Sequence, residues 1–362
     1  MKIGIIGLGE RMGNMLNAFR VEEPSLEIAG IVDSDPAKAS LRLPEADRSN
    51  VRFFESLMEL VKSSKPDALA IGTRCDTHSR FAIQAAKYNL PIYLEKPVAT
   101  STADAIRLEN TFKRSHCPVL ASFPLRASIL CQSARRLIDG HAIGNVEHLA
   151  ATNYVPYGDV YFSSWYRDYS VTQGLFLQKA THDFDYLAYL AGSPIVRVGA
   201  MLSKGRVYRD SKTRRNTPEP FAYYLEEIGT PETGMNEDSS NALLEFGNGA
   251  TGIYTQVFFS RRDAAKRGAI ISGFDGTIDF DWYKNELKCI HHHKPVTDIT
   301  KGEEGFSHFG GDSRLAANFI AMIREKADPI ATITDGLQSV HACLAARKSA
   351  ETGRFVSVRQ IG

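Results

Sequence analysis

Short apolar segments alternate with amphipathic segments over the first third of the chain. The apolar segments have the length and the β-branched content of buried strands, and helical periodicity recurs between them. Strands are predicted at residues 3–6, 28–32, 51–54, 68–71, 92–94 and 119–122, and helices at residues 11–20, 56–63, 78–88 and 102–114. Strands joined by helical crossovers form a doubly wound parallel sheet, so residues 1–122 are expected to form an α/β domain of the Rossmann type.

The pattern changes after residue 122. Helices are predicted at residues 126–138 and from about residue 182, and strands at residues 146–154, 195–202, 242–246, 250–258, 269–271 and 277–280. Hairpin turns at Gly247-Asn248-Gly249 and Asp275-Gly276 indicate antiparallel pairing. We therefore expect residues 123–362 to form an α+β domain with a mostly antiparallel open sheet.

Two segments of this second part are expected to be loops. Residues 157–174 are rich in aromatic and polar side chains. Residues 203–240 are basic in their first part and acidic in their second. A loop of that length is often a lid or a contact with another subunit, and solvated disorder is the alternative.

A glycine-rich turn follows the first predicted strand directly. This order of strand, turn and helix presents backbone N–H groups to a pyrophosphate. Gly7 permits the tight turn, and Gly9 lets phosphates approach the backbone. Compared with the pattern GxGxxG, the third glycine comes one position late, so that Met12 occupies the expected position. The second strand ends at Asp33, where a carboxylate would accept hydrogen bonds from an adenosine ribose.

Asp33 also bears on which dinucleotide is bound. A carboxylate repels a 2′-phosphate, and Ser34-Asp35-Pro36 offers no arginine to neutralise one, so NAD is expected rather than NADP. Lys38 is the nearby cation that keeps NADP as an alternative. The cofactor contacts predicted from the turn and from the second strand are Gly7, Leu8, Gly9, Glu10, Arg11, Met12, Asp33 and Ser34. An ordinary glycine-capped turn is the alternative to this interpretation.

Composition restricts the class of protein. A chain of 362 residues is long for one core and favours two domains. The net charge of +1 gives no indication of a nucleic acid or a membrane surface as partner. No apolar segment approaches the length of a membrane span, and no signal segment precedes the first strand, so a cytoplasmic protein is expected.

Cysteine and histidine positions favour a protein without a metal site. The five cysteines are scattered outside CxxC pairs, which indicates reduced thiols rather than disulfides or a structural zinc site. His291-His292-His293 suggests metal binding at first. Consecutive strand residues point to opposite faces, however, so a strand end or a hairpin is the expected structure there.

Glu95-Lys96-Pro97 follows the fifth predicted strand. A lysine at the ligand-binding edge of the sheet can donate a hydrogen bond to a substrate oxygen and stabilise the negative charge that develops as a hydroxyl is oxidised. The proline makes a cis peptide possible. The alternative is a surface lysine at a strand end.

A second polar cluster surrounds His182. On a helix, Lys179, His182 and Asp183 share one face. A histidine flanked by carboxylates suits a general base near neutral pH. The alternative is the N-terminal turn of a helix, with Thr181 as its cap and acidic residues that complement the helix dipole.

Together these motifs resemble the Gfo/Idh/MocA family, named for glucose–fructose oxidoreductase and inositol dehydrogenase. The resemblance also includes the Trp165-x-Arg167 element and the closing segments at residues 334–337 and 353–356. It implies that Lys96 and His182 are the catalytic pair. Family members often carry an aspartate four residues before the histidine, and this chain has Gln178 there. The proton-relay role of that aspartate would then have to be taken by Lys179 or Asp183.

The resemblance and the strand ends supply further predicted contacts. Thr73, Arg74 and His78 end the fourth strand, where the family holds the nicotinamide ribose, and Arg126 follows the sixth strand. The complete cofactor set therefore adds Thr73, Arg74, His78, Glu95, Lys96, Pro97 and Arg126. The predicted substrate contacts are Lys96, Arg167, Lys179, His182, Asp183 and His308. His308 lies in a glycine-containing segment that either closes over a sugar or caps the following helix.

The expected function is that of an NAD-dependent oxidoreductase, in which the substrate hydroxyl of a sugar or an inositol lies between Lys96 and His182. One alternative is an NAD-dependent glycoside hydrolase on the same fold, which would give product without net NADH. Another is a non-catalytic NAD-binding sensor.

The second domain is also expected to form a homodimer or a homotetramer. In the strand at residues 250–258, Ile253, Val257 and Phe258 lie beside the polar Thr251, Thr255 and Gln256. An exposed sheet face of this kind tends to be buried against a second copy. The alternative is a monomer in which residues 203–240 fold over the sheet.

Overall fold

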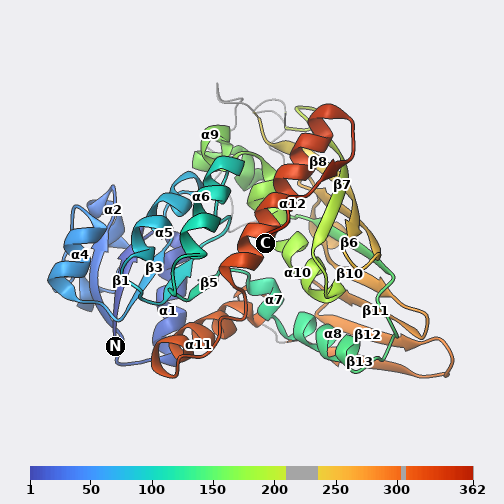
Figure 1. The fold of residues 1–362 in the computed structure, drawn as a ribbon, viewed down its shortest axis with the longest axis horizontal. Coiled ribbons are helices and arrows are strands. Elements are labelled where there is room, and N and C mark those ends of the chain that lie inside the picture. Colours follow the sequence, from blue (N-terminus) through green and yellow to red (C-terminus); the bar gives the residue numbers. More distant parts are fainter. Residues whose placement is uncertain (209–234, 303–306, 362) are drawn as a thin grey trace. The chain divides into compact units, whose positions relative to one another are not determined.

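The computed structural model describes residues 1–208, 235–302 and 307–361, and the chain divides into two compact units (Figure 1). The first unit comprises Met1–Ala127 and Gly310–Leu337, and the second comprises Ser128–Phe309 and Gln338–Gly362. The boundary expected at residue 122 assigns residues 310–337 to the second domain. In the structure these residues pack with the first unit, because helix α11 (Gly311–Arg324) lies against α1 (Glu10–Glu22) and α7 (Pro124–Ala127).

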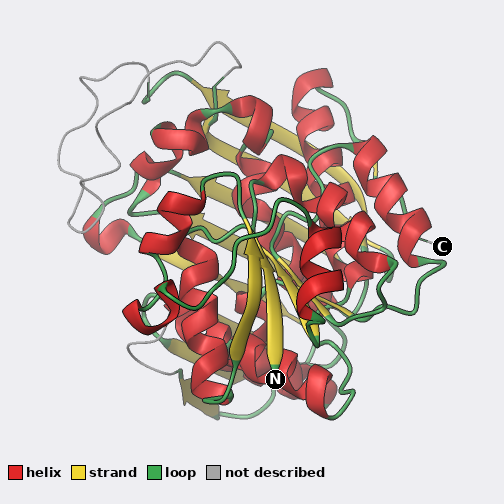
Figure 2. Cartoon of the chain, turned by 90° about the vertical axis from the view of Figure 1, so that its left-hand side faces the viewer, coloured by secondary structure: helices red, strands yellow, loops and turns green. Residues whose placement is uncertain are grey.

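The first unit is built on a five-stranded sheet in the order β2-β1-β3-β4-β5, and all of its strand pairs are parallel. The chain enters this sheet at its N-terminus (Figure 2). Its strands are β1 (Lys2–Ile6), β2 (Glu27–Val32), β3 (Ala68–Ile71), β4 (Ile92–Leu94) and β5 (Val119–Ala121). The other helices are α2 (Pro36–Leu41), α3 (Glu45–Arg48), α4 (Leu57–Ser64), α5 (His78–Ala86) and α6 (Thr102–Phe112). The predicted parallel Rossmann sheet is confirmed.

The strand predicted at residues 51–54 is wrong. Phe53 forms only an isolated parallel bridge with Ile31, and the backbone hydrogen bonds there are limited to two, both made by Ile31. The chain turns away at once, because Ser56 caps α4 by accepting a hydrogen bond from the Glu59 N–H. The apolar segment is therefore too short to extend the sheet beyond β2.

The second unit is built on a nine-stranded sheet in the order β13-β12-β11-β10-β6-β9-β8-β7-β14. All neighbours are antiparallel except the β6–β9 pair, which confirms a mostly antiparallel sheet. The strands are β6 (His148–Tyr154), β7 (Ile195–Lys204), β8 (Glu237–Phe246), β9 (Thr251–Val257), β10 (Lys266–Ser272), β11 (Gly276–Asp281), β12 (Glu286–His291), β13 (Thr297–Lys301) and β14 (Val356–Ser357).

Helices cover one face of this sheet. Helix α8 (Ile129–Asp139) packs on β12 and β13, and α10 (Thr181–Ala191) packs on β6. Helix α12 (Ile333–Thr352) begins in the first unit and continues into the second. Inward side chains such as Tyr254, Phe280 and Leu287 are almost completely buried. None of the helices in the described ranges combines the length and the apolar character needed to cross a membrane.

The opposite face of the sheet carries apolar side chains that remain exposed. Leu243 on β8 pairs with Ile253 on β9, and Ala150 on β6 lies between Ile253 and Ile270 on β10. The exposed fractions of Leu243, Ile253 and Ile270 are 52%, 45% and 40%. We call this row, residues 243, 253, 150 and 270, the open-face row.

For the strand predicted at residues 250–258, which corresponds to β9, the sequence placed two further side chains on the exposed face incorrectly. Gln256 and Phe258 are completely buried. Alternation along β9 explains this result, because residues 251, 253, 255 and 257 share one face while residues 256 and 258 point to the other.

Residues 157–174, which were expected to be a loop, contain three short helical segments. These are the 3-10 helices Gly158–Phe162 and Ser164–Arg167 and the helix α9 (Tyr169–Thr172). A Cβ at Gly158 would lie 1.7 Å from the Phe258 carbonyl oxygen, so only glycine allows this close approach to the end of β9. Most of the other segment expected to be a loop, residues 209–234, lies outside the described residues.

Candidate active site

The glycine-rich turn leaves the N-terminus of α1 open. Gly7 has a φ of +80°, and a Cβ there would lie 2.7 Å from the backbone of Thr73. Gly9 precedes α1 without a side-chain cap, and a Cβ at Gly9 would meet nothing within 4 Å. The N–H groups of the first turn and the open space beside them fit an anion such as a pyrophosphate. Leu8 is buried, and Glu10 is exposed in the first turn.

Met12 fills the position where the pattern GxGxxG has glycine. It is buried against Gly72, where a Cβ would lie 2.6 Å from the Met12 Cε. Gly72 therefore provides the space that the third glycine of the turn usually provides. The sequence placed Met12 among the cofactor contacts, and the structure gives it this packing role.

Asp33 joins the end of β2 to the turn. One carboxylate oxygen accepts the Leu8 N–H at 2.7 Å, and the other accepts the Asp35 N–H at 2.9 Å. Each oxygen has a second lone pair, which leaves acceptor capacity for ribose hydroxyls. Arg42 lies nearby and donates to the Leu8 carbonyl oxygen at 3.4 Å. Arg42 was not predicted, because it lies too far from Asp33 along the chain for a local motif to mark it. Ser34 is exposed beside them.

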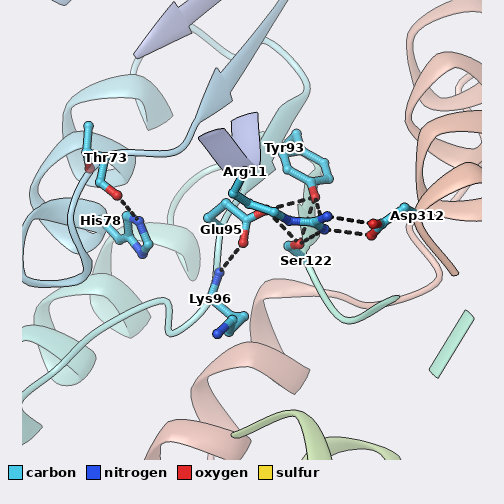
Figure 3. A network of polar contacts seen from close by, with 8 residues as sticks. All are labelled: Arg11, Thr73, His78, Tyr93, Glu95, Lys96, Ser122 and Asp312. Atoms are coloured by element: carbon cyan, nitrogen blue, oxygen red, sulfur yellow. Dashed lines mark hydrogen bonds and ion pairs between the residues drawn. The ribbon is translucent and has the colours of Figure 1, made fainter. Parts of the chain in front are cut away.

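Arg11 was expected to contact the cofactor, but its guanidinium is taken up by two protein carboxylates (Figure 3). It donates to both oxygens of Asp312 at 2.7 Å and to Glu95 at 2.9 Å. Tyr93 and Ser122 complete the cluster, and both donate to Glu95. We call these five residues the Arg11 network.

The Arg11 network holds Glu95 in its charged form. Burial by itself raises the pKa of Glu95, but Arg11 and Lys96 outweigh burial, so the pKa lies below its ordinary value. The second Glu95 oxygen accepts the Lys96 N–H at 3.3 Å. The Lys96 side chain is half-buried and points away from the network (Figure 3). Glu95 therefore fixes the backbone from which Lys96 projects.

His78 connects the segments that follow β3 and β4. Its Nδ1 lies 2.9 Å from the Pro97 carbonyl oxygen and its Nε2 lies 3.0 Å from the Thr73 carbonyl oxygen. The Lys96-Pro97 peptide is cis. Burial lowers the pKa of His78, which favours the neutral imidazole. Both ring nitrogens are thus engaged by the backbone.

The other cofactor residues predicted in the first unit differ in exposure. Arg74 is exposed. Arg126 is buried, and its guanidinium lies 3.1 Å from the Asp335 carboxylate.

The parallel sheet places Gly7, Asp33, Thr73 and Lys96 after the carboxyl ends of neighbouring strands, as the sequence predicted.

In the second unit, a π-helix at Phe176–Ala180 continues directly into α10. Insertions of this kind often occur at functional sites. Lys179 lies in the π-helix, and its Nζ donates to the Tyr157 hydroxyl at 2.7 Å. His182 lies in the first turn of α10, where its ring centroid is 6.1 Å from that of His308. The structure therefore brings His182 and His308 close together, and Lys179 precedes His182 by three residues on the same helical segment.

Asp183 is bonded to the sheet. Its two oxygens accept hydrogen bonds from Arg267 at 3.0 Å each, and Asn153 and Tyr254 donate to it at 2.9 Å. Both Asp183 and Arg267 are almost completely buried. These contacts favour a positioning role for Asp183, which anchors α10, over the substrate contact expected for it. Sequence analysis missed Arg267, whose only signal is a charge within an apolar strand.

The remaining candidate residues of the second unit lie on short segments. Arg167 is half-buried at the end of a 3-10 helix, after Trp165. Sequence analysis did not select Tyr157, although the aromatic-rich segment that contains it was noted. Gln178 is buried, and its N–H donates to the Gly174 carbonyl oxygen.

His291, His292 and His293 follow one another from the end of β12 into a hairpin. Their neighbours differ: His291 contacts Asp298, His292 contacts Thr277, and His293 lies 3.7 Å from Asp275. Across the described ranges, His, Cys, Asp and Glu side chains form no group of three that could hold a metal ion. All five cysteines are buried and free.

Replacing Arg11 by methionine would leave Glu95 and Asp312 buried without their cation. We expect Arg11→Met to lower the free energy of unfolding by about 3–5 kcal/mol, measured by urea denaturation. Arg107→Met is the control, because Arg107 forms an exposed pair with Asp104 and should lose less than about 1 kcal/mol. An equal loss of unfolding free energy in the two variants would contradict the proposed contribution of the Arg11 network to stability.

Comparison with known proteins agrees with this architecture. Residues 1–123 match the model of an oxidoreductase family with an NAD-binding Rossmann fold, and residues 135–358 match the C-terminal alpha/beta domain of the same family. The myo-inositol 2-dehydrogenase of Thermotoga maritima is 25% identical over 374 aligned positions, which cover 100% of this chain and 99% of that protein. Six other curated relatives are matched over 40% to 68% of their own length.

Solved structures share the fold. A levoglucosan dehydrogenase in complex with NADH and levoglucosan has a TM-score of 0.81 at 20% identity, covering 99% of this chain and 100% of that chain. An oxidoreductase from Agrobacterium radiobacter in complex with NAD+, L-tartaric acid and magnesium has a TM-score of 0.77 at 19% identity, covering 99% and 98% of the two chains. The chain therefore belongs to the Gfo/Idh/MocA family of NAD-binding oxidoreductases.

Proposed function

We propose that this protein is a dehydrogenase that transfers a hydride between a sugar- or inositol-type hydroxyl and the nicotinamide of NAD. The observation that carries the proposal is the position of Lys96 after β4, at the same sheet edge as the open N-terminus of α1 after β1. Ligands of such sheets lie outside the carboxyl ends of their strands. Relatives named as inositol and levoglucosan dehydrogenases support this substrate class.

The roles of the protein groups follow from their chemistry. The N–H groups at the start of α1 would hold the pyrophosphate, and Asp33 would accept hydrogen bonds from the adenosine ribose. When bound, NAD supplies the hydride acceptor. Lys96 donates a hydrogen bond to the substrate oxygen and stabilises the developing alkoxide. His182 takes the hydroxyl proton as a general base.

Removal of either catalytic group should slow turnover strongly. We expect Lys96→Ala and His182→Ala to lower kcat by about 10²–10⁴-fold, measured as NADH absorbance at 340 nm across sugars and polyols. NAD affinity should be nearly unchanged. The controls are Lys87→Ala and His116→Ala, which replace exposed residues outside the site.

Full turnover in Lys96→Ala and His182→Ala would refute these roles. Glycoside cleavage without net NADH would indicate the hydrolase alternative instead. Tight NAD binding without turnover of any sugar would indicate the sensor alternative.

Asp33 should determine the preference for NAD. We expect the wild type to bind NAD at least about tenfold more tightly than NADP, because the carboxylate bonds the ribose and repels a 2′-phosphate. Asp33→Ala and Asp33→Asn should lose this preference, since Arg42 and Lys38 remain close to the turn. Fluorescence titration with the two reduced dinucleotides measures the ratio. A wild type that binds NADPH as tightly as NADH would refute the assignment.

The open-face row is proposed to be the contact of a homodimer, or of a homotetramer assembled from two dimers. Sedimentation equilibrium at micromolar concentration should give two or four times the chain mass of 40.0 kDa. Ile253→Asp should yield a single chain, because it places a charge at the centre of the apolar row. Val21→Asp is the control, since Val21 is exposed on α1 of the first unit. A wild type of 40.0 kDa would reject the oligomer.

A further inference from the structure

Lys179 carries a buried ammonium group with an incomplete set of partners. The residue is 5% exposed. Its Nζ makes one hydrogen bond, to the Tyr157 hydroxyl at 2.7 Å. In the part of the chain that the structure describes, no carboxylate lies within ion-pair distance of this nitrogen. An ammonium has three N–H donors, so two of them remain available to a ligand.

The local charge is unbalanced around Lys179. Arg267 is close enough to lower the pKa of Lys179, in addition to the larger effect of burial. Asp183 is the acidic group nearby, but both of its oxygens are bonded to Arg267. Two basic side chains therefore share one carboxylate, so the protonated form of Lys179 lacks a carboxylate of its own among the described residues. An anion that entered this neighbourhood would remove the imbalance.

Aromatic rings keep the ammonium in place and favour its charged form. The Lys179 Nζ lies 4.8 Å from the centroid of the Tyr157 ring and 5.6 Å from that of Tyr161. Rings at these distances attract a cation through their electron-rich faces. They do not neutralise it. Among the described residues, the Lys179 amino group therefore has one oxygen partner and two aromatic faces, and its remaining donors point to no protein oxygen.

The position of Lys179 connects it with the proposed chemistry. It precedes His182 by three residues, in the π-helix that continues directly into α10, so the two residues lie about one helical turn apart. A substrate whose hydroxyl contacts His182 would therefore have other substituents within reach of Lys179. His308, near His182, adds a second group that can become positive.

We propose that the Lys179 ammonium binds a carboxylate of the substrate, and that the substrate is an anionic polyhydroxy compound such as a uronate or an aldonate. This inference rests on the proposed dehydrogenase function and narrows its substrate class. A carboxylate matches the two free donors of one ammonium. A phosphate is usually held by a bidentate arginine or by several cations, and the only arginine in this cluster is already paired with Asp183.

Matched sugar pairs test the proposal on the wild-type protein. The NADH-loaded protein is titrated by calorimetry with D-glucuronate and D-glucose, and with D-galacturonate and D-galactose. We expect the acid of at least one pair to bind about 10- to 100-fold more tightly than its neutral partner, as charge-assisted hydrogen bonds imply. D-glucose 6-phosphate is the third arm, and it should bind more weakly than glucuronate.

Variants then assign the preference to one residue. Lys179→Met should abolish the difference between acid and neutral sugar, because it weakens binding of the acid far more than binding of the neutral sugar. Lys204→Met is the matched control, because Lys204 also lies over a tyrosine ring, 4.6 Å from the centroid of Tyr169, but is exposed. Tyr157→Phe keeps the ring and the cation and should retain most of the preference.

Several outcomes would overturn the inference. These are equal wild-type affinities within both pairs, tighter binding of the phosphate than of the acid, or an acid preference that persists in Lys179→Met. The wild-type comparison decides the question even where Lys179→Met does not fold. Failure of every compound to reduce NAD counts against the proposed function, whereas the binding titrations still decide the role of Lys179.

Discussion

The carboxylates of Glu95 and Asp312 are buried, and their need for a cation joins distant parts of the chain within the first unit. Arg11 comes from the first turn of α1, Glu95 from the end of β4, and Asp312 from the first turn of α11. The three groups hold one another at hydrogen-bond distance. Because Glu95 also accepts the Lys96 N–H, the position of the proposed alkoxide-stabilising lysine depends on an ion-pair cluster that need not touch a substrate.

The second unit uses the same principle around His182. Asp183 is adjacent to His182 in sequence but points into the sheet, where Arg267, Asn153 and Tyr254 hold it. A fully bonded buried carboxylate of this kind specifies one orientation of α10 against β6, β9 and β10. In each unit a charged pair thus fixes the segment that carries a proposed catalytic group. Arg11 and Glu95 fix the segment of Lys96, and Asp183 and Arg267 fix the helix of His182.

Local patterns in the sequence predicted those features that depend on near neighbours. The buried strands of the parallel sheet, the turn at Gly7 and the strand end at Asp33 are encoded within a few residues. The partners of Arg11 are not, because Asp312 lies 301 positions away, and an arginine in a glycine-rich turn resembles a phosphate ligand until that partner is known. The same limitation applies to Asp183 and Arg267, 84 positions apart. Residues 157–174 were expected to be a loop because their aromatic side chains pack against Phe258, just after β9, and against Tyr208, and no local periodicity reveals such contacts.

The imidazole of His78 has a consequence for the segments on either side of Lys96. Both of its nitrogens face carbonyl oxygens, those of Pro97 and Thr73, yet a neutral ring carries only one hydrogen. One carbonyl therefore receives a hydrogen bond while the other meets a nitrogen lone pair. Moving the proton from one nitrogen to the other exchanges which segment is held. The neutral ring can therefore hold only one of the two segments through a hydrogen bond at a time.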